Sequence, residues 1–149
     1  MTLTEATIMR VRRGEAVSGP EFFGLLWEDC AFCAELGRVT LAAGRLESAL
    51  KQYVSARVPG SDTDKATLGR LIGYCEKHSC LDRLLPALRM LKEQRNYLIH
   101  SIHALLFGLV EETILEGSGL VDSDVATYTE RAWQLKENLL GLAEVVEGA

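Results

Sequence analysis

Residues 93–103 read Glu93-Gln94-Arg95-Asn96-Tyr97-Leu98-Ile99-His100-Ser101-Ile102-His103, and this stretch indicates the fold class. It begins as a polar helix surface and ends inside an apolar run that continues to residue 110. At about 100° per residue, Asn96, His100 and His103 fall within about 60° of one another on a helix. A polar stripe on an apolar helix needs partners, so we expect it to be satisfied inside the fold or across an interface.

Arg95 occupies a different side of the same helix. On a straight α-helix it lies about 140° around the axis from His100, so the two side chains do not aim at one point. A bend in the helix or a second copy of the chain is needed to bring them together.

The rest of the chain repeats the spacing of an amphipathic helix. The three prolines are Pro20, Pro59 and Pro86, and no alternating strand pattern of any length is present. Apolar residues three and four apart predict helices over 22–58, 68–75, 81–107 and 125–146, with Gly37 either interrupting the first or lying within it. The sequence therefore predicts an all-α, antiparallel helical bundle of four to six helices.

Residues able to cap a helix precede these segments. Ser18-Gly19-Pro20-Glu21 combines a cap, a proline and an acidic residue in the order of a helix start. Thr63 or Asp64 is expected to cap the second helix, and Asp122 or Ser123 the last. We expect residues 1–19 to form a flexible lead-in and residues 20–149 to form one domain.

The charge balance limits the class of function. The formal net charge is −5 and the isoelectric point is near 5.2, which argues against a protein that coats nucleic acid with a broad basic face. A nuclease with a local basic cleft is still compatible with it. No apolar run is long enough to span a bilayer and the N-terminus lacks a signal sequence, so we expect a cytoplasmic protein without a membrane partner.

Four cysteines leave three interpretations. Cys30 and Cys33 have CxxC spacing, and Cys75, His78 and Cys80 offer further ligand atoms for a structural zinc ion. However, the first pair lies inside a helical apolar pattern, and the second pair has the wrong spacing for zinc. We therefore predict plain buried thiols and no metal site or cofactor, with a zinc site and a redox motif as the alternatives.

Arg95, Asn96 and His100 form the best candidate for chemistry. Histidine moves protons near neutral pH, arginine donates to a phosphate that gains negative charge, and asparagine orients an imidazole or donates to phosphate. Together they can support metal-free RNA cleavage, in which the ribose 2′-OH attacks the adjacent phosphate. The alternative is a hydrogen-bonded network with a purely structural role.

The segment Arg95-Asn96-Tyr97-Leu98-Ile99-His100 resembles the signature of the HEPN superfamily, an arginine followed by a polar residue and a histidine, with four to six residues between arginine and histidine. Residues 46–50 and 67–72 resemble the helices that precede this motif. The resemblance covers roughly residues 35–110. It implies a helical bundle that forms a homodimer, with two copies of the motif meeting in a composite site.

Many HEPN proteins are metal-independent endoribonucleases in toxin–antitoxin, phage-defence or RNA-processing systems, and others are inactive interaction domains. The resemblance implies an RNA substrate, with Arg95 stabilising the phosphate, Asn96 orienting and His100 acting as acid and base. It also implies a cognate antitoxin protein as a partner. Ile102 stands where toxins paired with a nucleotidyltransferase often carry a modified tyrosine, while Tyr97 and His103 are auxiliary candidates.

Overall fold

The computed structural model describes residue 5 and residues 18–101 and 121–149. This part of the chain contains α-helices, one π-helical turn and no strands, so the predicted all-α helical bundle is confirmed. None of the helices in these ranges combines the length and hydropathy needed to cross a membrane. The elements are α2 (Gly19–Glu28), α3 (Cys30–Arg57), α4 (Leu68–Lys77), α5 (Leu85–Asn96), η1 (Tyr97–Ser101) and α7 (Val121–Glu147).

The chain divides into two compact units. The first comprises Met1–Gly37 and Tyr97–Trp133, and the second comprises Arg38–Asn96 and Gln134–Ala149. Both α3 and α7 contribute residues to each unit. The Arg95–His100 motif is divided as well, because the boundary falls between Asn96 and Tyr97.

In the first unit, α2 begins as its sequence predicts. The Ser18 hydroxyl accepts a hydrogen bond from the Glu21 amide at 3.3 Å, and the Glu21 carboxylate accepts one from the Ser18 amide at 3.1 Å. This reciprocal capping box satisfies two backbone donors that the helix itself leaves unpaired. Behind it, Phe22 is fully buried, and its ring lies 5.5 Å from that of Tyr128 in α7.

The break between α2 and α3 lies at Asp29, which the sequence did not predict. The Asp29 carboxylate accepts a hydrogen bond from the Phe32 amide at 2.7 Å, so it caps the start of α3. The helix then continues through Gly37 to Arg57. One continuous helix over 22–58 and a break at Gly37 were the two predictions, and both are wrong. The break lies eight residues before Gly37, where Asp29 caps α3.

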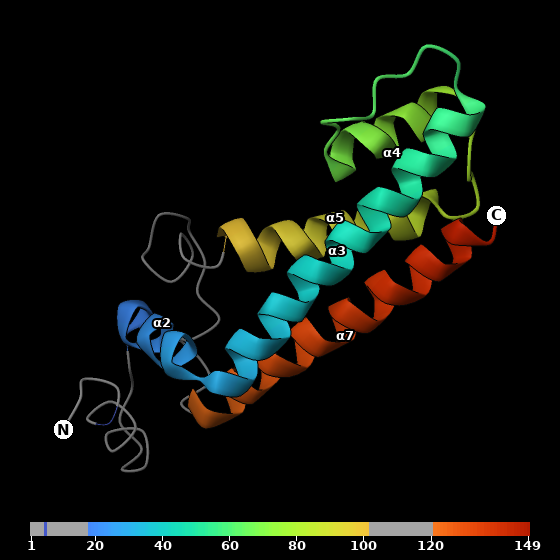
Figure 1. Cartoon of the computed structure of the whole chain (residues 1–149). Helices are drawn as coiled ribbons and strands as arrows, with labels where there is room; N and C mark the ends of the chain where they lie inside the picture. Colours follow the sequence, from blue (N-terminus) through green and yellow to red (C-terminus); the bar gives the residue numbers. More distant parts are fainter. Residues whose placement is uncertain (1–4, 6–17, 102–120) are drawn as a thin grey trace. The chain divides into compact units, whose positions relative to one another are not determined.

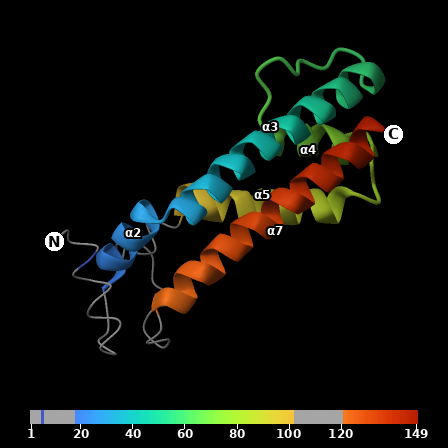
Figure 2. The ribbon, with the colours of Figure 1, turned by 60° about the horizontal axis from the view of Figure 1, so that its bottom comes forward.

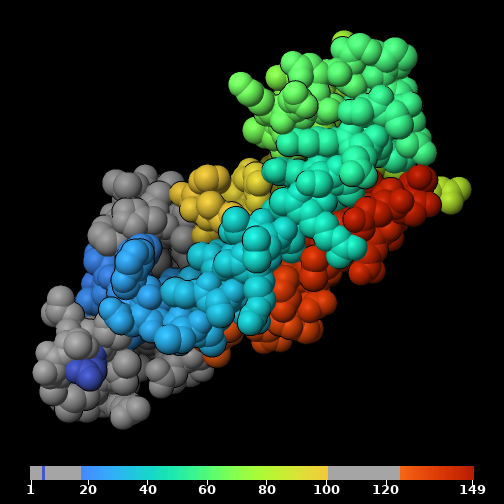
Figure 3. Space-filling view, in the orientation of Figure 1, coloured from blue at the N-terminus to red at the C-terminus, as the bar shows by residue number. Residues whose placement is uncertain are grey.

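In the second unit, α5 runs opposite to α3, and the C-terminal part of α7 runs in the same direction as α3 (Figure 1, Figure 2). Figure 3 shows the side chains of α3 next to those of this part of α7. Arg45 joins the two helices through a 2.7 Å contact with Glu147. Apolar side chains with at most 2% exposure form the core of this unit, among them Val39, Leu46, Leu50, Val54, Leu68, Leu71, Leu88, Leu135 and Leu139.

The start of α7 differs from the prediction. The helix begins at Val121, so Asp122 and Ser123 lie inside its first turn and the predicted caps are wrong.

Two other helix starts also differ from the prediction. Helix α4 begins at Leu68 with Thr67 as its cap, whose hydroxyl accepts from the Arg70 amide at 3.3 Å, so the predicted caps Thr63 and Asp64 are wrong. Helix α5 begins at Leu85 rather than residue 81, because Ser79 and Leu81 both have φ of 54°. That left-handed backbone cannot belong to a right-handed helix.

Candidate functional site

The guanidinium of Arg95 is held by two side chains of the second unit. Its Nη1 donates to Glu47 Oε1 at 3.3 Å, and its Nη2 donates to Asn96 Oδ1 at 3.0 Å. The side chains of Arg95 and Glu47 are only 19% and 26% exposed. A cation and a carboxylate in this position are mutually dependent, because removal of either leaves a poorly solvated charge.

Arg95 keeps donors beyond these two contacts. A guanidinium carries five N–H groups, of which the two contacts use one on each Nη. The Nε–H is buried and has no partner within the described part of the chain. One N–H on each Nη is therefore left to donate to another acceptor while Glu47 and Asn96 keep the side chain in place.

Asn96 is oriented by the same contact. Its Oδ1 accepts from Arg95, so its Nδ2 carries two N–H donors that this bond does not use. The sequence predicted that Asn96 orients the imidazole or donates to a phosphate. In the structure its side chain accepts a hydrogen bond from Arg95, the preceding residue in the chain. The structure adds Glu47 to this pair, which the sequence did not predict.

The sequence carries one signal for Glu47. It stands among Leu46, Ala49 and Leu50, whose helical spacing places Glu47 next to the apolar side of the helix. A carboxylate in such a position needs a cation or several donors. The sequence does not predict which lysine or arginine pairs with Glu47, because the partner, Arg95, lies 48 residues away.

Tyr97 faces the interior of the first unit. Its hydroxyl lies 3.1 Å from the hydroxyl of Tyr128, which is 1% exposed and stands on α7. Each phenol can donate to the other, so this contact satisfies the polar end of a buried tyrosine. Tyr97 therefore has a structural contact within the first unit, in addition to its predicted auxiliary role in the site.

His100 is exposed and stands on the π-helical turn η1. The rotation of about 140° between Arg95 and His100 assumes an uninterrupted α-helix, and the wider π turn has i→i+5 pairing and fewer degrees per residue. The expectation of one α-helix through residues 81–107 is wrong at Tyr97 for this reason. His103 and Ile102 lie outside the described residues.

The cysteines are all free, but they are not all buried. Cys75 is buried and Cys80 is partly exposed, whereas Cys30 and Cys33 are exposed at the start of α3. The prediction of plain buried thiols is therefore wrong for the CxxC pair. Within residues 18–101 and 121–149, no three histidine, cysteine or carboxylate side chains gather in the manner of a metal site.

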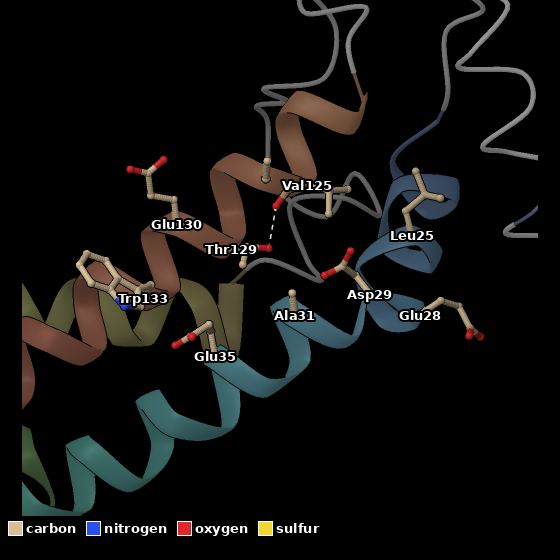
Figure 4. Close-up of a pocket in the computed structure, with 10 residues that line it drawn as sticks. Leu25, Glu28, Asp29, Ala31, Glu35, Val125, Thr129, Glu130 and Trp133 are labelled. Atoms are coloured by element: carbon tan, nitrogen blue, oxygen red, sulfur yellow. Dashed lines mark hydrogen bonds between the residues drawn. The ribbon is translucent and has the colours of Figure 1, made fainter.

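The first unit contains a cavity of about 600 Å³ that the sequence analysis did not find. Figure 4 shows it between α2, the start of α3 and α7, with Asp29 at the junction of α2 and α3. Four carboxylates line it, from Glu28, Asp29, Glu35 and Glu130, together with Trp133. The Thr129 hydroxyl at this wall donates to the Val125 carbonyl at 3.0 Å.

The fold defines the class of protein as an all-α helical chain. Its candidate site has a hydrogen-bonded arginine–asparagine pair, followed in the chain by a π turn that carries an exposed histidine. Comparisons of the chain with protein-family models, with curated proteins and with solved structures returned no match.

Proposed function

We propose that the protein is a metal-independent endoribonuclease whose active site is composite and forms between two copies of the chain. The observation that carries this proposal is the π turn that begins directly after Arg95 and Asn96 and presents His100 to solvent. Single π turns are rare in helices and occur frequently at functional sites. The resemblance of residues 95–100 to the HEPN signature supports the same assignment.

In this proposal His100 acts as the acid and base of an internal transesterification. The base removes the proton from a ribose 2′-OH, and the 2′ oxygen attacks the adjacent phosphorus. The bond from phosphorus to the 5′ oxygen breaks, and an acid protonates the leaving oxygen. The products are a 2′,3′-cyclic phosphate and a free 5′ hydroxyl, and two copies of His100 supply one base and one acid.

Arg95 and Asn96 stabilise the phosphate as its negative charge grows. The unused N–H groups on the two Nη atoms and on Asn96 Nδ2 are charge-assisted or neutral donors for phosphate oxygens. Glu47 keeps the guanidinium in one orientation before RNA binds, which reduces the rearrangement needed during the reaction. An RNA-cleaving toxin of a toxin–antitoxin or phage-defence system, controlled by an antitoxin protein, is the role that we propose for this activity.

The test compares four proteins on total RNA in EDTA: the wild type, Arg95→Ala, His100→Ala and Arg89→Ala. The Arg89 guanidinium is on the same helix, but it is exposed and paired with Glu76, so its variant is a matched control for loss of positive charge. We expect losses of about 100-fold or more for Arg95→Ala and His100→Ala. We expect little change for Arg89→Ala, with all variants folded by circular dichroism.

The proposal fails if purified wild-type protein cleaves no RNA, or if Arg95→Ala and Arg89→Ala cleave equally. Light scattering is the second measurement, because a composite site requires a dimer. A protein that cleaves RNA as a monomer contradicts the composite site but not the nuclease.

One observation favours a second candidate, a non-catalytic helical interaction module. The partly buried Arg95–Glu47 pair is what a structural network within a bundle requires. This candidate predicts that Arg95→Ala lowers stability and dimerisation without any nuclease activity to lose. The same four proteins therefore separate the two candidates.

A further inference from the structure

The CxxC segment lies in the first turn of a helix, with both thiols exposed. Cys30 is the first residue of α3, Cys33 follows three positions later, and both are free. The rise and radius of an α-helix place Cα atoms three residues apart at about 5 Å. Disulfides join Cα atoms about 4.4–6.8 Å apart, so the backbone spacing is suitable for a bond.

The side chains require a small local adjustment. Cβ atoms three residues apart on a helix are about 5–6 Å apart, whereas a disulfide needs about 3.5–4.5 Å. The first turn is the part of a helix that can tighten, because its amides lack partners within the helix. Here Asp29 holds that turn through its carboxylate and its carbonyl, which accept from the Phe32 amide at 2.7 Å and the Cys33 amide at 3.0 Å.

Cys33 already contacts the end of the preceding helix. Its Sγ lies 3.4 Å from the carbonyl oxygens of both Leu26 and Trp27, which share its single S–H donor. These carbonyls belong to the last turn of α2, and the Leu26 carbonyl also accepts from the Asp29 amide at 3.2 Å. The protonated thiol of Cys33 therefore connects the end of α2 to the start of α3.

We propose that Cys30 and Cys33 form a reversible intramolecular disulfide when they react with a small disulfide oxidant, and that this bond releases the contact between α2 and α3. The Cys30 thiolate attacks one sulfur of the oxidant, and the other sulfur leaves as a thiolate. The Cys33 thiolate then attacks the sulfur of Cys30 and displaces the second small thiolate. Two thiol protons are released, and two electrons pass from the protein to the oxidant.

Two features predict a bond that is easily reduced. The tightening of the first turn stores strain in the oxidised form, and strained or exposed disulfides have more oxidising potentials than buried structural ones. Oxidation also removes the one S–H that Leu26 and Trp27 share, so the oxidised state loses a hydrogen bond that the reduced state has. These are the properties of a modification site rather than of a structural crosslink.

The other two cysteines provide an internal control. Burial, followed by the charges of Cys80 and Glu76, raises the pKa of the Cys75 thiol to about 11. The thiolate is the reactive form, so Cys75 stays protonated and inaccessible near neutral pH. Cys75 is therefore expected to remain reduced under conditions that oxidise Cys30 and Cys33, and Cys80 then has no partner nearby for an intramolecular bond.

The test exposes the folded full chain to oxidised glutathione, blocks remaining thiols with iodoacetamide and maps the tryptic peptides. Cleavage after Arg13 and Arg38 yields one peptide that holds both Cys30 and Cys33, whereas Cys75 and Cys80 fall in separate peptides. We expect residues 14–38 to lose two hydrogen atoms and to carry no added group. The Cys33→Ser variant should instead retain one glutathione on Cys30.

The proposal is overturned if wild-type residues 14–38 keep two alkylatable thiols, or if they retain glutathione without ring closure. Release of the α2 contact is tested with Trp133→Phe, which leaves Trp27 as the only tryptophan. Its fluorescence should change on oxidation and return on reduction. An unchanged signal in a fully oxidised sample contradicts the release of the contact.

The charges around Cys33 set the rate of ring closure. Burial raises the pKa of the Cys33 thiol, and the charges of Asp29, Cys30 and Glu28 raise it further. Asp29→Asn retains a capping side chain but removes the charge that raises the pKa of Cys33 most. We expect the mixed disulfide to close about twofold faster near neutral pH, since a lower pKa increases the thiolate more than it weakens the nucleophile. Glu28→Gln, which removes the weakest of these charges, should change the rate less.

Discussion

Two arginines of α5 each pair with a glutamate of another helix, and the two pairs differ in their exposure to solvent. Arg89 contacts Glu76 of α4 at 2.8 Å, with side chains 51% and 43% exposed. Arg95, six residues later, contacts Glu47 of α3 at 3.3 Å, with much less exposure of either side chain. The first pair has the shorter contact, but water screens its charges and competes for its donors.

The comparison shows that distance alone does not rank ion pairs. An exposed pair contributes little because each partner is solvated without the other. The partly buried pair depends on both partners, and its arginine also binds Asn96, so three side chains are arranged together. We therefore expect Glu47 to matter for stability and for the orientation of Arg95, and Glu76 to matter for neither.

The largest expected difference comes from truncation of the two glutamates. Glu47→Ala should lower the free energy of unfolding by about 2 kcal/mol, because it leaves the Arg95 guanidinium poorly solvated and unpaired. Glu76→Ala should lower it by less than about 0.5 kcal/mol. Urea denaturation of both variants measures this difference, and equal midpoints with equal slopes would contradict the comparison.

A smaller effect is expected when the charge is removed but the acceptor is kept. Glu47→Gln retains a side-chain carbonyl that can accept from Arg95 Nη1, so it should cost about 1 kcal/mol rather than the full loss of the alanine variant. Glu76→Gln should be indistinguishable from wild type in the same denaturation experiment. If Glu47→Gln is as unstable as Glu47→Ala, then the charge rather than the hydrogen bond holds Arg95.

The smallest effect concerns salt. Double-mutant cycles on Glu76 and Arg89 should give a coupling of about 0.3 kcal/mol that disappears in about 1 M salt. The cycle on Glu47 and Arg95 should retain most of its coupling, because little solvent reaches the pair. Loss of both couplings at high salt would show that the difference in exposure has no energetic consequence.

Local signals in the sequence predicted much of the helical structure. The capping box of Ser18 and Glu21 begins α2 as expected, and Leu46 and Leu50 are buried, as their helical spacing predicted. The cap at Asp29 was missed, since an aspartate within an apolar pattern is read as one more exposed position. It becomes a helix start only through its bond to Phe32.

The assignment of Arg95, Asn96 and His100 to one site stays a prediction. The hydrogen bond from Arg95 to Asn96 was not predicted. Neither the π turn of Tyr97–Ser101 nor the contact of Tyr97 with Tyr128 was predicted, because hydrophobic spacing does not distinguish a local widening of the helix. The exposure of Cys30 and Cys33 was also missed, since cysteine counts as apolar in such a pattern.

The sequence by itself determined the all-α class, the core stripes and the arginine–asparagine–histidine segment, because these depend on neighbours within one or two helical turns. The tertiary structure alone decided that Glu47 pairs with Arg95 and that the CxxC thiols are exposed at the start of α3. The physical reason is that ion pairing and burial depend on which distant segments pack together. Hydrophobic periodicity reports neighbours within a few residues, so it does not predict a contact between residues 48 positions apart.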